Sequence, residues 1–200
     1  MPKNDKKTIP LGSGDLYGAT VPSTLPATDA EWVALISTVC VDANMMGKVK
    51  SGASIEYSGT THVEKCDDNS VVKIITVEED ASLKPGLIAW NSEILNKVID
   101  RSKITSHTSG TGTTAKNYRI CKLGGKGNEQ DQDFVLIFHH IDTRDGDTWT
   151  ILKGRNTAPI TFKYAPDAGS MLEPTFTATP LDSDGTLIVF IEELDDGAST

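Results

Sequence analysis

Hydrophobic and polar positions are irregular at the start of this 200-residue chain and become periodic further along. Residues 1–28 contain four prolines and predict an extended arm, in which residues 15–21 (DLYGATV) are a candidate short strand. Thr28 followed by Glu31 has capping-box spacing, which predicts a short helix over residues 29–38. β-branched residues become frequent toward Val41 and favour an early end to this helix.

The next segment predicts a strand, a loop and a second strand. Residues 58–69 (SGTTHVEKCDDN) are mostly polar and predict the loop. The β-branched run in residues 71–77 predicts the second strand, and the DDNS sequence before it favours a turn. Residues 83–90 (LKPGLIAW) are a further apolar stretch, which Pro85 and Gly86 interrupt.

Residues 91–101 (NSEILNKVIDR) form the clearest predicted helix. Its apolar residues fall in one stripe, and Asn91 or Ser92 can cap it. We expect this stripe to lie on a sheet while Lys97, Asp100 and Arg101 face water.

From residue 116 onward, short apolar-rich segments alternate with turn sequences. The segments are 116–125, 132–142, 147–154, 159–165, 174–181 and 186–193. Short strands at this spacing predict a mainly β sandwich or barrel. No repeat or linker divides the chain, so we expect one domain over residues 1–200, with an N-terminal arm (about 1–28) and an acidic C-terminal tail (about 193–200).

Charge is unevenly distributed along the chain, whose net value is −9. Lys3, Lys6 and Lys7 make the first residues basic, whereas residues 179–200 hold six acids and no Lys or Arg. Ends of opposite sign suit head-to-tail contact between copies, and two solvated termini are the alternative. The negative net charge argues against tight, general nucleic-acid binding.

The chain has no run of eighteen apolar residues, so no transmembrane helix is expected. Its first residues are polar and lack the apolar core of a secretory signal, so we expect synthesis and residence in a cytoplasm. Cys40, Cys66 and Cys121 are widely spaced, which fits reduced thiols.

The stretch 179–197 (TPLDSDGTLIVFIEELDDG) resembles a calcium loop at first sight. With Gly185 at the sixth position, an EF-hand loop would need acids where Pro180 and Ile191 stand. Asp184-Gly185 before an apolar run instead indicates a hairpin turn that leads into a strand over residues 186–192.

Other candidate motifs also favour structural interpretations. His139 and His140 are adjacent, so on a strand they face opposite sides and cannot chelate one metal together. Residues 109–116 (SGTGTTAK) lack phosphate-loop spacing and predict a hairpin loop. The chain shows no nucleophile or acid–base constellation, so we expect no catalytic site, no cofactor and no metal.

Several segments match one family in order along the chain. They are LGSGDLY, KSGASIEYS, ITVEEDASLKPGLIAWN, DTRDGDTWTILKGRNTA and FTATPLDSDGTLIVFIEE. Three blocks carry the match best: residues 44–58, residues 81–98, and the final strand–DG–strand block that ends in EE. Together, over roughly residues 10–194, they resemble the major tail tube proteins of tailed phages that infect Gram-positive bacteria. The segment SHTSGTGTTAKNY and the histidine pair at 139–140 depart from the family's pattern.

The resemblance implies two packed β-sheets, as a sandwich or partial barrel, with a flanking helix. It also implies hexameric rings that stack into a tube, in which neighbours pair strand edges left open in one subunit. The implied partners are further copies of the chain, a tape-measure protein, tail terminator and distal tail proteins, and passing DNA that is bound without sequence specificity. The implied location is the virion tail, after assembly in the host cytoplasm, with no membrane insertion.

Arms and loops are the expected contacts between subunits. The candidates are Lys3, Lys6, Lys7, Thr60, Thr61, His62, Glu64, Asp67, Asp68, Asp195 and Asp196. Carboxylates that line the lumen would repel DNA and let it slide.

Two other functions remain open at this point. One is the inner tube of a contractile tail or of a phage-tail-like bacteriocin. The other, from a different class, is a β-sandwich ligand-binding module such as a lectin, which would expose aromatic residues on loops. Trp32, Trp90 and Trp149 lie instead inside apolar segments.

Overall fold

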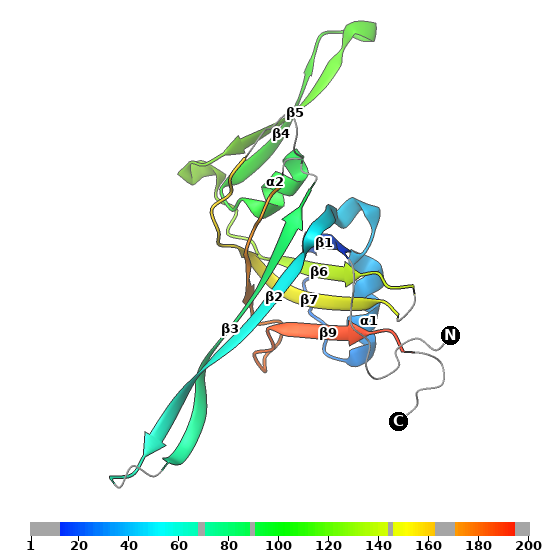
Figure 1. Cartoon of the computed structure of the whole chain (residues 1–200). Coiled ribbons are helices and arrows are strands. Elements are labelled where there is room, and N and C mark those ends of the chain that lie inside the picture. Colours follow the sequence, from blue (N-terminus) through cyan, green and yellow to red (C-terminus); the bar gives the residue numbers. More distant parts are fainter. Residues whose placement is uncertain (1–12, 68–70, 89–90, 144–145, 163–170, 195–200) are drawn as a thin grey trace.

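The computed structural model describes residues 13–67, 71–88, 91–143, 146–162 and 171–194. These residues form a β-barrel body from which two hairpins extend in opposite directions (Figure 1). The helices are α1 (Asp29–Val39) and α2 (Ser92–Val98), with short 3-10 turns at Asp42–Asn44, Gly112–Thr114 and Lys126–Asn128. The strands are β1 (Gly14–Thr20), β2 (Met45–Lys65), β3 (Val71–Leu87), β4 (Ser102–Ser109), β5 (Lys116–Leu123), β6 (Phe134–His140), β7 (Thr148–Asn156), β8 (Phe176–Thr179) and β9 (Ile188–Glu192).

The larger sheet closes on itself. Its seven strands have the order β6-β1-β2-β3-β8-β7-β9, and β6 also pairs with β7. Six strands therefore form a ring, and β9 lies on the same edge of β7 as β8. Strands β4 and β5 make a separate two-stranded sheet. The expected mainly β fold, with two sheets and a helix at both predicted places, is confirmed. Helix α2 is shorter than the predicted 91–101, because it ends at Val98 and Ile99 is already extended.

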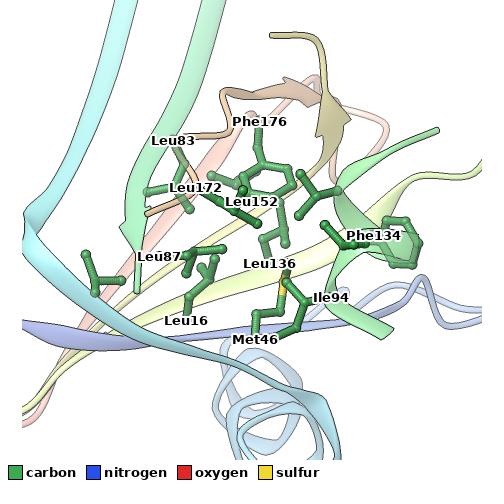
Figure 2. Close-up of a cluster of buried hydrophobic side chains, with 13 residues drawn as sticks. Leu16, Met46, Leu83, Leu87, Ile94, Phe134, Leu136, Leu152, Leu172 and Phe176 are labelled. Carbon is green, nitrogen blue, oxygen red and sulfur yellow. The ribbon is translucent and has the colours of Figure 1, made fainter. Parts of the chain in front are cut away.

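Alternation along the strands creates two cores, because successive side chains point to opposite faces of a sheet. Inside the barrel, Leu16, Leu136 and Leu152 are fully buried with Phe176 (Figure 2). Helix α2 adds its predicted apolar stripe, with Ile94, Leu95 and Val98, to this cluster.

The second core lies on the outer surface of the barrel, under α1. Val135, Ile137 and Ile151 come from the same strands as the inner core but face outward, against Leu35 and Val39 of α1. The helix begins where the sequence predicts, because Thr28 and Glu31 form the reciprocal hydrogen bonds of a capping box.

Helix α2 is held to the barrel by a lysine that sequence reasoning expected to face water. Lys97 is half-buried, and its Nζ donates to the Gly18 carbonyl oxygen of β1 at 2.6 Å. Burial lowers the pKa of this amine below its ordinary value. The expectation for Lys97 was wrong because its Nζ finds an acceptor on β1, which compensates for the partial burial of the charged group.

Several other expectations need correction. Residues 58–65 belong to β2 rather than to a loop, and β4 was not predicted at all. Residues 159–162 form no strand, while 163–165 of that predicted segment lie outside the described residues. Strands β8 and β9 do not pair with each other as a hairpin; both run antiparallel to β7 on the same edge.

Candidate assembly surfaces

Beyond the barrel, β2 and β3 continue as a long ribbon, here called the β2–β3 hairpin (residues 54–80; Figure 1). Every described side chain of this hairpin is exposed, including six large apolar ones. Tyr57 is 61% exposed and Ile74 is 62% exposed. The six are Ile55, Tyr57, Val63, Ile74, Ile75 and Val77.

The register places these apolar side chains on both faces of the ribbon. Val63 lies opposite Ile74 on one face, and His62 lies opposite Ile75 on the other. An isolated two-stranded ribbon is marginally stable at best, because neither face has a layer to pack against. The β2–β3 hairpin thus has apolar surface that the described part of the chain leaves uncovered.

Polar contacts on the β2–β3 hairpin are cross-strand and local. Lys84 Nζ lies 2.6 Å from Glu56 Oε2, at the base of the ribbon. The Tyr57 hydroxyl donates to the Glu79 carboxylate, and this hydrogen bond raises the pKa of Tyr57. Near the tip, His62 Nε2 lies 3.1 Å from Glu64 Oε2.

The sequence-predicted interface residues fall into two groups. Thr60, Thr61, His62 and Glu64 lie together on the outer part of β2, and Asp67 lies in the turn that follows. All five are exposed. The remaining candidates lie outside the described residues; they are Lys3, Lys6, Lys7, Asp68, Asp195 and Asp196.

A second ribbon, here called the β4–β5 hairpin (residues 102–123), extends from the opposite end of the barrel (Figure 1). One face, with Ile104 opposite Cys121, is turned toward the barrel, since Cys121 packs on the inner core. The other face carries Ile120 and Tyr118, which are 42% and 49% exposed. The loop at its tip is the predicted hairpin connection, SGTGTTAK.

Hydrogen bonds fix the base of the β4–β5 hairpin to α2. Ser102, which is 2% exposed, donates from Oγ to the Ile99 carbonyl oxygen at 2.7 Å. Gln130 Nε2 donates to the Ser102 carbonyl oxygen at 2.8 Å. Arg119 Nη1 lies 2.9 Å from Glu93 Oε1 of α2. The hairpin therefore leaves the body in a defined direction.

The barrel also has an open strand edge at β9, which is the last strand in the sheet order. Within the described residues, β9 pairs only with β7, so its other edge has no strand partner. Val189 and Ile191 face the α1 core, whereas Phe190 is 57% exposed. An unpaired edge beside an exposed aromatic residue is suited to pairing with another chain.

The Asp-Gly loop before β9 is organised by Asp182. Its Oδ1 accepts hydrogen bonds from the backbone N–H groups of Asp184 (3.0 Å) and Thr186 (2.9 Å), and bonds with Thr186 are the main reason its pKa is lowered. Gly185 has φ +87°, which glycine adopts readily. Asp182 therefore stabilises a turn. This agrees with the sequence, in which the spacing of the acids around Gly185 does not fit a calcium-binding loop.

A polar cluster ties the end of β9 to the β6–β7 connection. His139 Nε2 lies 2.9 Å from Asp147 Oδ2, and the His139 ring stacks on Trp149 with centroids 5.0 Å apart. Glu193 N donates to the Asp147 carbonyl oxygen at 2.9 Å.

His140 is buried on the opposite face of β6, with Nδ1 3.1 Å from the Ser13 carbonyl oxygen. The two adjacent histidines therefore face opposite sides, as strand periodicity predicts.

We also searched the described residues for metal ligands, reactive thiols and membrane-spanning helices. Among them, no three His, Cys, Asp or Glu side chains gather closely enough to hold a metal ion. Burial raises the pKa of the Cys40 thiol to about 11, so Cys40 is protonated at neutral pH. No described helix has the length and apolar character needed to cross a membrane.

Two comparisons with known proteins were made, one with family models and one with curated proteins. No protein-family model matches the chain, and no curated protein matches it.

Sequence reasoning missed the apolar residues that these surfaces expose. Tyr118 and Ile120 lie on a strand that was predicted, but their exposure was not. Ile74 and Val77 were treated only as strand formers. The sequence did contain a signal for this exposure. These apolar residues are frequent in segments that also contain many charged and polar residues, and such a composition does not suit a buried core.

Proposed function

We propose that this chain is a structural tail tube subunit, which polymerises as stacked hexameric rings into a hollow tube that conducts DNA from virion to host. The observation that carries the proposal is the β2–β3 hairpin, an exposed ribbon with apolar side chains on both faces. Such a ribbon gains stability when neighbouring copies cover it. The ring, the stacking and the tube come from the family resemblance of the sequence.

Two further observations support assembly through this chain's own strands. The free edge of β9 can accept a strand from a neighbour, which would extend the sheet from one copy to the next. The β4–β5 hairpin offers a second exposed ribbon at the other end of the molecule (Figure 1). A subunit with contacts at opposite ends suits a repeated heterologous assembly.

The ligand-binding module is less well supported. A lectin-like site would use aromatic side chains exposed on loops. Trp32 and Trp149 pack instead against the core under α1, and Trp90 lies outside the described residues. The inner tube of a contractile tail is a variant of the same proposal. In both cases the subunit builds a tube, and only the proteins around that tube differ.

Electron microscopy of the purified protein, alone and with tail partners, tests the proposal. We expect stacked rings with a central channel. A compact monomer that never assembles, even with tail partners, would contradict it.

A pair of matched variants tests whether the β2–β3 hairpin carries assembly. Ile74→Glu places a charge on the exposed hairpin, and Val33→Glu places the same charge on the exposed side of α1, where Val33 is 56% exposed. We expect Ile74→Glu to fold but lose assembly, and Val33→Glu to assemble. Normal assembly of Ile74→Glu would argue against a role for this surface.

The proposed conduction of DNA needs a separate test. Acids that face the lumen would repel the phosphate backbone, so DNA would slide without sticking. Once the rings identify which acids face inward, changing these acids to Lys should slow DNA ejection. Unchanged ejection would count against electrostatic repulsion in the lumen.

A further inference from the structure

The two hairpins carry opposite charges. The β4–β5 hairpin contains four basic residues and no acid, whereas the β2–β3 hairpin contains seven acids and two lysines. The bases are Lys103, Lys116, Arg119 and Lys122. The acids are Glu56, Glu64, Asp67, Asp68, Glu78, Glu79 and Asp80, and the lysines are Lys65 and Lys73.

Like charges face each other within the β4–β5 hairpin. Lys103 lies directly opposite Lys122 in the register, and Lys116 lies on the same face. All three are exposed, and none has an ion pair within the described part of the chain. Like charges directly opposite each other destabilise a strand pair, so an acidic partner would relieve this repulsion.

The β2–β3 hairpin presents the complementary arrangement. Glu78 lies opposite Thr60 and Asp80 lies opposite Ser58, so both carboxylates point to one face. Neither has an ion pair with another described residue, and both are exposed. Ile75, opposite His62, shares this face, just as Tyr118 and Ile120 share the face of the three lysines.

The two surfaces cannot meet within one chain, because the hairpins extend from opposite ends of the barrel (Figure 1). Each copy would engage one neighbour through its acidic surface and another through its basic surface. Such a heterologous contact leaves an unused surface at each end, so it can repeat along an axis.

We propose that the lysine face of the β4–β5 hairpin docks on the acidic face of the β2–β3 hairpin of a second copy. This inference deepens the proposed function and rests on it, because it takes the partner to be another subunit. Opposite charges orient the two ribbons, and the apolar side chains on the same faces supply contact area. DNA is an alternative partner for the lysines. The net charge of −9 on the chain repels DNA, however, and DNA binding would leave the acidic β2–β3 hairpin without a role.

Charge reversal on each hairpin tests the pairing. One variant is Lys103→Glu with Lys122→Glu, the second is Glu78→Lys with Asp80→Lys, and the third combines all four changes. Either reversal alone should raise the critical concentration for assembly by about tenfold or more, because like charges then face each other. The combined variant should recover assembly, and an equal mixture of the first two should co-assemble.

The matched control is Lys48→Glu with Asp42→Lys, which changes exposed charges on the body. This control should assemble like the wild type. Circular dichroism confirms that each variant is folded, while sedimentation and electron microscopy measure assembly. Fluorescence anisotropy with a short labelled DNA duplex measures nucleic-acid binding in parallel.

The outcomes separate the pairing from the proposed function. If the wild type forms tubes but neither reversal weakens assembly, or the combined variant fails to recover it, the pairing is wrong while the tube function stands. If the lysine reversal abolishes DNA binding but leaves assembly intact, the β4–β5 hairpin is a nucleic-acid arm and the pairing is overturned. If the wild type assembles under no condition, both fail.

Discussion

At Gly154 the backbone of β7 passes so close to β8 that no side chain fits. A Cβ built there would lie 2.0 Å from the Thr177 carbonyl oxygen, which is fixed in the β7–β8 ladder. Gly154→Ala should therefore destabilise the protein by about 1–3 kcal/mol, because the strands must separate. Urea unfolding measures this change. Gly127→Ala, where a Cβ meets nothing within 4 Å, is the control and should have little effect.

Cys40 gives the stability of the protein a pH dependence in the alkaline range. Burial raises its pKa from 9.0 to about 11, so the folded state holds a proton that the unfolded chain releases. This stabilising contribution is fully present below pH 9 and is lost as the pH rises through about 11, with about 2 kcal/mol lost by pH 11.

The Cys40→Ala variant should lack this component. Between pH 8.5 and 11 its free energy of unfolding should therefore fall by about 2 kcal/mol less than that of the wild type. Urea unfolding at the two pH values measures the difference. Cys66→Ala, at an exposed position after β2, should retain the wild-type fall. Equal losses in wild type and Cys40→Ala would show that the half-buried Cys40 thiol contributes nothing.

Helix α2 is short, so its cap matters to the element as a whole. Asn91 Oδ1 accepts hydrogen bonds from the backbone N–H groups of Glu93 (2.8 Å) and Ile94 (3.0 Å). Asn91→Ala should cost about 1 kcal/mol of stability, whereas Asn91→Asp should retain most of it because a carboxylate accepts the same bonds. Thermal unfolding distinguishes the two; equal losses would contradict the capping role.

The elements that sequence reasoning predicted well are those with one buried side. The capping box of α1 and the apolar stripe of α2 each marked a helix, and β6 and β7 appeared as apolar runs. Strand β4 was missed because most of its side chains are exposed, so burial imposes no clear apolar–polar alternation on SKITSHTS. The outer part of β2 was mistaken for a loop for the same reason.

The candidate surfaces were only partly predictable. The tip residues Thr60, His62 and Glu64 were proposed as contacts, and they do lie on the exposed β2–β3 hairpin. Their strand conformation and the opposing basic hairpin depend on pairings between residues far apart in sequence. Strand order, such as β1 between β2 and β6, likewise required the three-dimensional fold.

At the scale of the whole molecule, the barrel and the hairpins have separate roles. No described side chain of residues 54–80 is buried, so the body does not depend on the hairpin for its core. Replacing residues 59–79 by Asn-Gly would join Ser58 to Asp80, which are paired in the register, through a two-residue turn.

This truncated protein should unfold within a few degrees of the wild-type temperature and should not assemble. Differential scanning calorimetry and electron microscopy measure the two properties. Loss of folding would show that the hairpin is part of the stabilising core. Normal assembly would show that the hairpin is not an interface.

The arrangement of β8 and β9 has a practical consequence. Each is held to β7 by its own ladder, and the exposed Ser183 and Asp184 lie in the loop between them. Residues inserted at this point would lengthen the loop without shifting the register of either strand. A short peptide tag placed there would mark the same position on every copy, and in a micrograph its spacing would report the symmetry of whatever the subunits build.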